Sequence, residues 1–184
     1  MIARACQGVA SRVRRALLRL RGARIPHPVW LRAIEVPRQA QRIELRAGAG
    51  LDRGVALVVS GDPAAPPCIT IGERVYINRY TILDASIGLA IGDDCMIGPF
   101  CYLTDHDHTF GADLRPAAGP LLGRPTTLEP GCWLGAHVTV LKGVTIGAGT
   151  VVGAGSVVTR DLPAGVIAVG SPARVLKSRA QGRP

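Results

Sequence analysis

The sequence contains few aromatic residues and comparatively few acidic ones. Trp, Tyr and Phe make up 4% of the 184 residues, and 13 acidic residues face 22 Lys and Arg, which gives a net charge of +9. Such an excess often accompanies nucleic-acid binding. However, residues 1–24 contain seven arginines and no acid, which leaves only +2 for the rest of the chain. We therefore expect no nucleic-acid partner, because the basic footprint is missing from the main body.

The cysteines also lack the spacing of a metal site or a disulfide framework. There are five of them, an odd number, and none forms a CxxC pair. This pattern argues against structural zinc and a disulfide scaffold, so we expect no metal and a reducing compartment. Arginines interrupt every apolar run near the N-terminus before it reaches the length of a secretory signal. We expect a cytoplasmic protein.

Residues 1–24 predict a basic amphipathic helix. Apolar residues recur there at helical spacing, at Ile2, Cys6, Val9, Val13, Leu17 and Leu20. The simplest interpretation is a short helix packed on the end of the main domain. Another is a helix lying on the inner face of the membrane, where arginines meet lipid phosphates. The composition is also that of a mitochondrial presequence, which is a third interpretation.

The C-terminal half repeats with a period of six. From Leu128 it divides into LEPGCW, LGAHVT, VLKGVT, IGAGTV, VGAGSV and VTRDLP, and each block begins with an aliphatic residue. Most fifth positions are small or β-branched. Earlier blocks with the same period begin at Ile71, Ile77, Leu83, Ile91 and Ile97. The interval from Leu83 to Ile91 is eight residues, which is a slip of two. Three cysteines, Cys95, Cys101 and Cys132, occupy fifth positions, so we interpret them as packing residues.

A period of six does not fit a helix, but it fits short strands joined by tight turns. Three such sides make one coil of about 18 residues, and stacked coils share one core. The fold class is therefore predicted as all-β, a parallel β-helix solenoid with an N-terminal helix and one extruded loop. The uncharged run 143–159 approaches the length of a membrane span, but its glycine-punctuated repeats favour the solenoid.

The repeat stops between Leu103 and Leu128. Residues 104–127 are rich in Pro and Gly, have no period, and begin with TDHDHTF, which contains His106 and His108. A long loop in a tightly wound solenoid is more often functional than accidental. An imidazole suits general-base chemistry near neutral pH, although this chemistry does not separate the two histidines. Because adjacent side chains rarely face each other, we name no carboxylate that orients them.

The stretch WLGAHVTVLKGVTIGAGTVVGAGSVVTRDLPAGVIAVGSPARVLK at residues 133–177 resembles the hexapeptide-repeat acyltransferases. It looks closely like the C-terminal coils of the galactoside, maltose and polysaccharide O-acetyltransferases, and the resemblance covers roughly residues 70–178. It implies a left-handed solenoid, whereas the general rule for parallel crossovers favours the right hand. The expected organisation is a basic helix at 1–24, irregular early coils at 25–68, a left-handed β-helix at 69–165 with loop 104–127, and a C-terminal tail at 166–184.

The resemblance implies a coenzyme A-dependent O-acetyltransferase that moves an acetyl group from acetyl-CoA to a sugar hydroxyl, in a surface polysaccharide or its precursor. It also implies a homotrimer with active sites between subunits. The family places the general base five residues after the last inward aliphatic, which is His108 when counted from Leu103. His106 stays the alternative base. The implied coenzyme contacts are Trp133, Ala136, Ala154, Thr159, Arg160 and Lys177. The implied acceptor contacts, blurred by the slip, are Asn78 and Asp84.

Two other functions remain open from the sequence. One is an N-acyltransferase that acts on an amino sugar with the same base and donor. The other is a non-catalytic trimeric β-helix that serves as a scaffold or binds a metal. A trimeric metal site needs three histidines, but His137 lies 29 residues after His108 and alternation points it outward. We therefore expect His137 to be structural.

Overall fold

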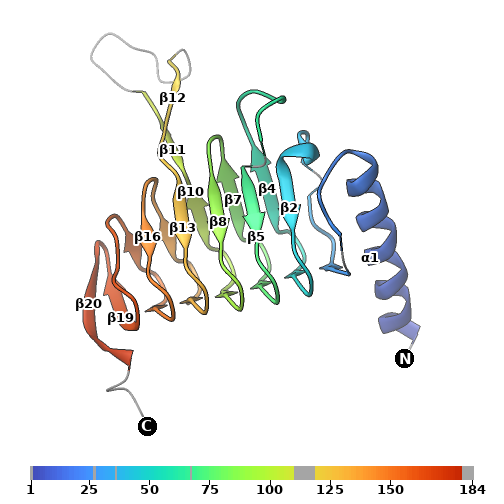
Figure 1. Cartoon of the computed structure of the whole chain (residues 1–184). Helices are drawn as coiled ribbons and strands as arrows, with labels where there is room; N and C mark the ends of the chain where they lie inside the picture. Colours follow the sequence, from blue (N-terminus) through green and yellow to red (C-terminus); the bar gives the residue numbers. More distant parts are fainter. Residues whose placement is uncertain (1, 27, 36, 67, 110–118, 180–184) are drawn as a thin grey trace.

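The computed structural model describes residues 2–26, 28–35, 37–66, 68–109 and 119–179, with the backbone alone for residues 2–7 (Figure 1). The chain is mostly β, with α1 (Ile2–Leu20) near its N-terminus and a short 3-10 helix, η1 (Ala40–Arg42). Across the described residues the strands collect into three sheets and one projecting hairpin. The predicted mostly-β fold with an N-terminal helix is confirmed.

Each sheet gathers strands from successive turns of the chain. Sheet A contains β2 (Ile43–Leu45), β5 (Ile69–Ile71), β8 (Leu89–Ile91), β13 (Thr126–Leu128) and β16 (Thr145–Ile146). Sheet B contains β1 (Trp30–Leu31), β3 (Gly50–Leu51), β6 (Tyr76–Ile77), β9 (Met96–Ile97), β14 (Trp133–Leu134), β17 (Val151–Val152), β19 (Val166–Gly170) and β20 (Ala173–Ser178). Sheet C contains β4 (Ala56–Val59), β7 (Ile82–Ala85), β10 (Tyr102–Thr104), β15 (Thr139–Val140) and β18 (Val157–Val158).

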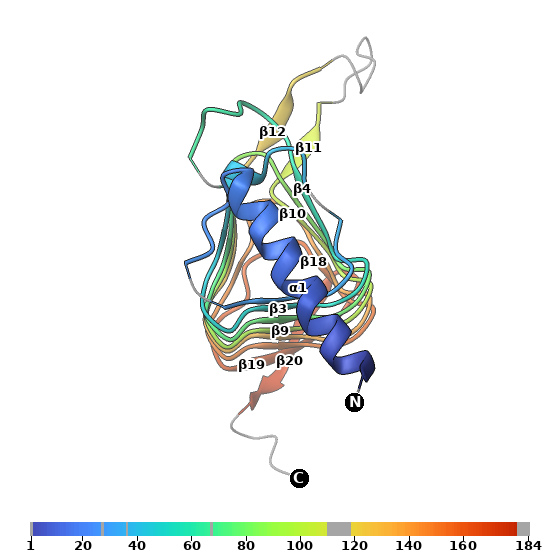
Figure 2. The ribbon, with the colours of Figure 1, turned by 90° about the vertical axis from the view of Figure 1, so that its right-hand side faces the viewer.

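The chain visits the sheets in the order A, B, C and then begins again one strand further along. β8, β9 and β10 form one such coil, and β13, β14 and β15 form the next. The strands are parallel and in register, so that Ile91 lies opposite Leu128 and Leu103 opposite Val140. Figure 2 looks along the stack and shows the coils superimposed around a common interior.

The predicted inward positions form the core. The leading aliphatic residues of the six C-terminal blocks have exposed fractions of 0–1%: Leu128, Leu134, Val140, Ile146, Val152 and Val158. Cys95, Cys101 and Cys132 are equally buried, which confirms that they pack in the interior. Burial raises the pKa of the Cys101 thiol, so it stays protonated.

Residues 25–68, expected to form irregular early coils, supply β1 to β4 in register with the later strands. Leu45 lies opposite Ile71, and Leu51 lies opposite Ile77. The period is hidden in the sequence because the connection from β4 to β5 is longer than the turns that follow. Residues 166–178, expected as part of a tail, also pair: β19 runs parallel to β17, and β20 returns antiparallel to β19.

α1 packs on the first coil through a face that the sequence did not single out. Leu18 and Ser11 are buried, and the Ser11 hydroxyl accepts a hydrogen bond from the N–H of Leu31 at 2.9 Å. The predicted apolar stripe faces away from the coils, with exposed fractions from 48% to 84% at Val9, Val13, Leu17 and Leu20. The side chains of Ile2 and Cys6 lie outside the described residues. α1 therefore covers the end of the stack (Figure 2), and its apolar stripe stays exposed.

Close stacking of the coils makes a specific prediction for Gly135. A Cβ added there would lie 2.6 Å from the backbone nitrogen of Ala154, whereas a Cβ added at Gly88 would meet Pro125 at an ordinary 3.6 Å. Neither glycine has a positive φ. We expect Gly135→Ala to lower the free energy of unfolding by about 1–3 kcal/mol through overpacking. Gly88→Ala should cost much less. Urea denaturation of both variants checks this, and equal losses would contradict it.

Candidate active site

The hairpin at the interruption of the repeat carries both loop histidines. β11 (His106–His108) pairs antiparallel with β12 (Leu121–Gly123), which places His106 opposite Gly123 and His108 opposite Leu121. The hairpin projects from the edge of the stack where β10 ends (Figure 1). Its base is tied to the coils because the Thr126 hydroxyl donates a hydrogen bond to the Thr104 carbonyl at 2.9 Å. Residues 110–118, part of the predicted loop, lie outside the described residues.

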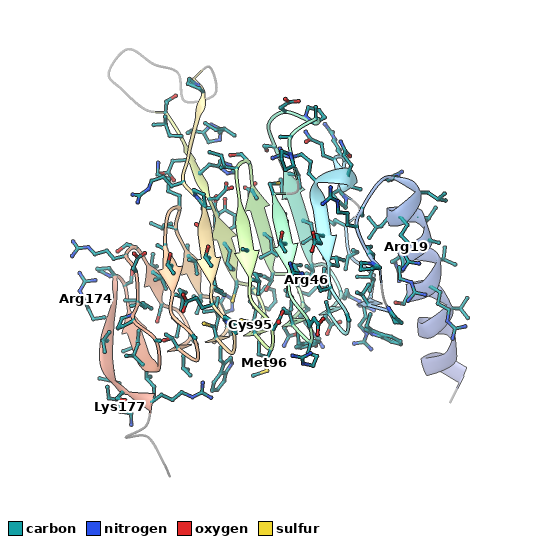
Figure 3. The ribbon with its side chains drawn as sticks, in the orientation of Figure 1. Arg19, Arg46, Cys95, Met96, Arg174 and Lys177 are labelled. Atoms are coloured by element: carbon teal, nitrogen blue, oxygen red, sulfur yellow. The ribbon has the colours of Figure 1, made fainter. Side chains whose placement is uncertain are left out.

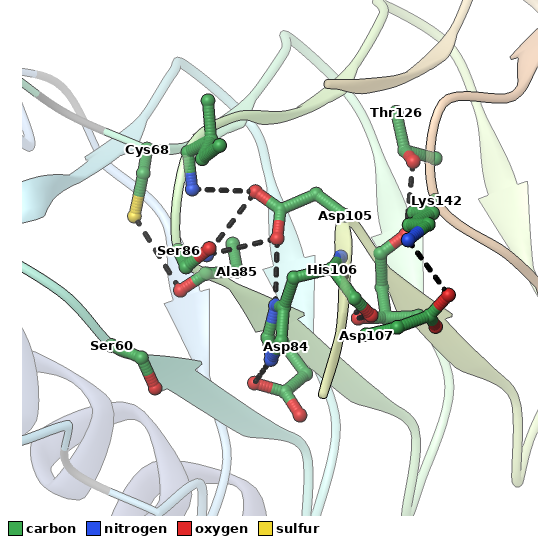
Figure 4. Close-up of polar contacts among 12 residues, drawn as sticks. Ser60, Cys68, Asp84, Ala85, Ser86, Asp105, His106, Asp107, Thr126 and Lys142 are labelled. Atoms are coloured by element: carbon green, nitrogen blue, oxygen red, sulfur yellow. Dashed lines mark hydrogen bonds and ion pairs between the residues drawn. The ribbon is translucent and has the colours of Figure 1, made fainter. Parts of the chain in front are cut away.

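The carboxylate of Asp105 anchors this hairpin. Asp105 is fully buried, and its oxygens accept hydrogen bonds from the backbone N–H groups of Ser86, Ile87 and Gly88 at 2.9, 2.7 and 2.5 Å (Figure 4). These three residues form the turn between β7 and β8, which is where the sequence slips by two residues. The slip therefore builds a three-donor cradle for the carboxylate that begins the hairpin.

Asp105 also orients the neighbouring histidine. The chain bends at Asp105, so that its Oδ1 lies 2.8 Å from Nδ1 of His106. The adjacent pair thus does meet, contrary to the general expectation for neighbouring side chains. A proton on Nδ1 would be held by the carboxylate, which leaves the lone pair on Nε2. His106 is mostly buried.

The other side of the His106 ring faces Asp84 of β7. Nε2 of His106 lies 3.9 Å from Oδ1 of Asp84, and the hydroxyl of Tyr102 donates to Oδ2 of Asp84 at 3.0 Å. Burial, and also the hydrogen bond to Asp84, raise the pKa of Tyr102, which therefore stays a donor at neutral pH. In the described part of the chain, the buried Oδ1 of Asp84 accepts no hydrogen bond. Tyr102, Asp84, His106 and Asp105 form one polar row, of which Figure 4 shows the last three.

His108, the predicted base, lies further out on the hairpin and is exposed. Between the two histidines, Asp107 pairs with Lys142 of the next coil at 2.9 Å, and Lys142 also donates to the Leu122 carbonyl at 3.2 Å. The structure thus places the predicted base at the open end of the strand and the alternative base, His106, at its buried end.

The predicted coenzyme residues lie elsewhere on the stack. Trp133 stands exposed on sheet B, in register between Met96 and Val151. Ala136 and Ala154 occupy the same corner of successive coils, where the N–H of Gly155 donates to the Ala136 carbonyl at 2.9 Å. The remaining residues are exposed: Thr159 and Arg160 after β18, and Lys177 on β20 (Figure 3).

A single copy of the chain does not bring Trp133 to the histidines, whereas Thr159 and Arg160 follow β18 at the corner between sheets C and A, where the hairpin also leaves the stack. Sheet B, which carries Trp133, forms the side of the stack opposite to the β11–β12 hairpin (Figure 2). Of the predicted acceptor residues, Asp84 joins the histidines. Asn78 does not, because it lies in the corner after β6, where its Oδ1 accepts a hydrogen bond from Arg79 N–H at 2.8 Å.

His137 points outward, as predicted, and its ring stacks on Phe100 at a centroid distance of 5.0 Å. Among the residues that the structure describes, no group of three or more His, Cys, Asp or Glu side chains is placed to hold a metal ion.

Comparisons with known proteins agree with the repeat. Residues 125–160 match the family described as bacterial transferase hexapeptide (six repeats). Galactoside O-acetyltransferase from Escherichia coli strain K12 is 40% identical over 110 residues, which are 59% of this chain and 53% of that protein. The chain spans about half the length of the curated relatives it matches.

Solved structures of acyltransferases are also similar to this chain. A galactoside acetyltransferase in complex with coenzyme A is 34% identical, with a TM-score of 0.57, over 66% of this chain and 64% of that one. A mutant of AntD, an N-acyltransferase from Bacillus cereus in complex with dTDP-4-amino-4,6-dideoxyglucose and coenzyme A, has a TM-score of 0.74 over 90% of this chain and 89% of that one. Its identity is 21%, so this likeness shows a shared fold alone.

The anchoring role of Asp105 predicts a large difference between two neighbouring aspartates. Asp105→Asn weakens a charge-assisted cradle and places an amide N–H against backbone donors, so we expect unfolding free energy to fall by about 2 kcal/mol or more. The matched change Asp107→Asn removes only a surface ion pair, which is worth at most about 1 kcal/mol. Urea unfolding measures both. If Asp107→Asn proved as costly as Asp105→Asn, the anchoring role would be wrong.

Proposed function

Because the chain is a relative of the hexapeptide-repeat acyltransferases, as its sequence predicted, we propose that it is a coenzyme A-dependent O-acetyltransferase. It moves an acetyl group from acetyl-CoA to a hydroxyl of a saccharide, in a surface polysaccharide or its precursor. The observation that carries this proposal is the imidazole-bearing hairpin inserted between two coils that otherwise keep perfect register. By the same kinship we propose that the coils wind in the left-handed sense.

We assign the general base to His108. Its ring takes the proton of the acceptor hydroxyl while that oxygen attacks the thioester carbonyl carbon. The tetrahedral intermediate then collapses, the carbon–sulfur bond breaks, and the proton passes to the leaving sulfur as coenzyme A departs. Such base catalysis contributes about 10²–10⁴-fold to the rate. Exposure of His108 at the open end of β11 supports this role, because an acceptor can reach it there.

We propose that His106 and Asp84, which belong to the polar row, contact the saccharide acceptor. The carboxylate of Asp105 fixes the His106 ring, and Oδ1 of Asp84 offers an unused acceptor for a sugar hydroxyl. This arrangement also makes His106 the competing base, since a carboxylate-oriented imidazole is the usual form of that catalyst.

The proposed donor residues lie on sheet B, in the corner after it and in the corner after sheet C. We propose that acetyl-CoA lies along Trp133, Ala136 and Ala154, with Thr159 and the basic Arg160 and Lys177 toward its nucleotide end. The two alanines leave room at their corner, and both basic residues are exposed, so that phosphates can meet them. Asn78, in the equivalent corner of an earlier coil, contributes to the acceptor side.

The separation of donor and acceptor residues supports a homotrimer. A neighbouring copy must bring Trp133 to the histidines, since sheet B lies opposite the β11–β12 hairpin in one stack. Sheet B carries a matching column of exposed apolar side chains: Trp30, Tyr76, Met96 and Trp133. Closed cyclic assembly would cover this column and complete three equivalent sites.

Transfer to an amine is the second candidate. The likeness to the AntD N-acyltransferase extends over nine-tenths of this chain, including the early coils. An amino-sugar acceptor would use the same donor and the same hairpin, so only the acceptor separates the two activities.

We propose that the protein works in the cytoplasm at the inner face of the membrane, held there by α1. Its exposed apolar stripe lies beside the exposed Arg12 and Arg19, which suits the boundary of an anionic bilayer. The described part of the chain contains no helix that is long and apolar enough to cross a membrane.

The base assignment predicts different outcomes for the two histidines. His108→Ala should lower acetyl-CoA turnover by about 10²-fold or more, whereas His106→Ala should keep most of the rate. Turnover is measured against a panel of sugars and amino sugars, and urea unfolding controls for folding. Native-level activity in His108→Ala, or a greater loss in His106→Ala, would defeat the assignment. Product analysis of the panel decides between hydroxyl and amine acceptors.

Membrane contact predicts that charge on the stripe abolishes binding. The double variant Leu17→Asp with Leu20→Asp should no longer sediment with phosphatidylcholine vesicles containing phosphatidylglycerol. The matched variant Val175→Asp with Leu176→Asp alters two exposed aliphatic residues at the other end of the stack and should bind like the native protein. Equal binding by all three proteins would exclude α1 as the contact.

A further inference from the structure

A cavity beside α1 is lined by charged groups that acyl transfer does not use. Its volume is about 530 Å³, and it lies between α1 and the segments that follow β1, β3 and β6. Its charged and aromatic lining residues are Arg14, Arg32, Asp52, Arg53, Arg79 and Tyr80. We propose that this cavity binds a phosphate group carried by the saccharide acceptor.

The coil repeat stacks two of these arginines. The Arg53 carbonyl accepts a hydrogen bond from the N–H of Tyr80 at 3.0 Å, so Arg53 and Arg79 occupy the same corner of successive coils. Neighbouring strands lie about 4.8 Å apart. From the side, Arg14 of α1 donates to the Leu31 carbonyl at 3.3 Å. Arg53 and Arg79 are exposed, and like charges stacked in one column of the sheet repel each other.

The cavity has one carboxylate among its lining residues, and that carboxylate is already occupied. Asp52 accepts hydrogen bonds from the Arg32 guanidinium at 3.2 Å, the Tyr76 hydroxyl at 2.9 Å and the Arg53 N–H at 2.7 Å. Burial opposes its ionisation, but these hydrogen bonds outweigh burial and hold the pKa of Asp52 below its usual value. Four arginines therefore line the cavity together with one aspartate, and this excess of positive charge attracts an anion.

Another corner of the stack contains an arginine whose charge is neutralised by a carboxylate of the following coil. Arg74 meets Asp94 of the following coil through two hydrogen bonds, of 2.6 and 2.7 Å. Within the described residues the guanidinium groups of Arg53 and Arg79 have no such carboxylate. Planar guanidinium groups match the oxygens of a phosphate bidentately, which favours a phosphate as the missing anion.

An aromatic wall completes the cavity. Tyr80 has a φ of 59°, which is an outlier for a bulky side chain. Its ring stacks on Phe100 at 5.3 Å and lies over Gly54, where an added Cβ would come within 2.4 Å of the ring. The ring is thus fixed beside the guanidinium groups. A flat apolar wall next to a cationic one suits a ligand that joins a sugar ring to a phosphate.

The position of the cavity connects it with the acceptor. Asn78, on the acceptor side of the proposed reaction, directly precedes Arg79 in the chain. The role of the phosphate in the acceptor rests on the proposed function, whereas phosphate binding by the cavity does not. α1 contributes Ala10 and Arg14 to the lining, so an acceptor linked to a lipid phosphate would reach the cavity from the membrane side of that helix.

The binding test uses inorganic pyrophosphate and the full chain, measured by isothermal titration calorimetry at low salt. The double variant Arg53→Gln with Arg79→Gln should bind at least tenfold more weakly than the native protein. The matched control is Arg46→Gln with Arg74→Gln, which removes the same charge from paired arginines of neighbouring coils. It should bind within twofold of the native protein. Absence of binding by the native chain, or equal weakening in both variants, would overturn the site.

A stability measurement guards against misfolding. Without ligand, the Arg53/Arg79 double variant should be at least as stable as the native protein, because it removes mutual repulsion. A large loss of stability would instead assign these arginines to the fold and would overturn the proposal.

The acceptor is tested with a sugar 1-phosphate in solution and with vesicles that contain phosphatidic acid. Binding of either carrier that depends on Arg53 and Arg79 supports the site and tells a soluble from a lipid-linked phosphate. In turnover assays, the double variant should raise KM for a phosphorylated acceptor at least tenfold, with kcat and the KM for acetyl-CoA unchanged. An unchanged acceptor KM would overturn the acceptor role. If the native protein transferred no acetyl group but still bound pyrophosphate, the proposed function would be refuted and the phosphate site would stand.

Discussion

Parallel hydrogen bonding between successive coils is the constraint on which this structure depends. Each coil must present its strands at the same heights as the coil before it, with one aliphatic side chain turned inward on each side. The register of Ile91 with Leu128 and of Leu103 with Val140 persists across the inserted hairpin. Consequently, side chains on the outside also line up in columns, one coil above another. Whether two functional groups lie close together therefore depends on which coil and which sheet carry them, as much as on their separation in the sequence.

This constraint explains how an insertion can carry a reactive site. The chain leaves the stack after Thr104 and rejoins it at Thr126, and its two ends are fixed by the parallel ladders of sheet C and sheet A, respectively. The Asp105 carboxylate then joins the departing strand to the widened turn between β7 and β8. The departing strand supplies the carboxylate that accepts hydrogen bonds, and the turn supplies the three backbone N–H groups that donate them. The histidines are thereby presented on a rigid base.

The repeat made most of the fold predictable. Phase and residue type identified the inward aliphatic residues, the buried cysteines and the outward His137. The early coils escaped because the long connection after β4 hides their phase. Three features of the sites depend on tertiary geometry. The bend at Asp105 lets adjacent side chains meet, the outward face of α1 is set by what Leu18 and Ser11 contact, and Arg53 stacks with Arg79 only once the coils are in register. In other solenoids, aligning equivalent positions of successive coils would likewise identify charged residues that lie above one another.

A structure of the protein with bound coenzyme A tests the central claim most directly. The account predicts a trimer in which the thiol lies beside Trp133 of one copy, within reach of the His106–His108 strand of its neighbour. A coenzyme bound with its thiol far from every imidazole, or held entirely by one copy on another side of the stack, would contradict it.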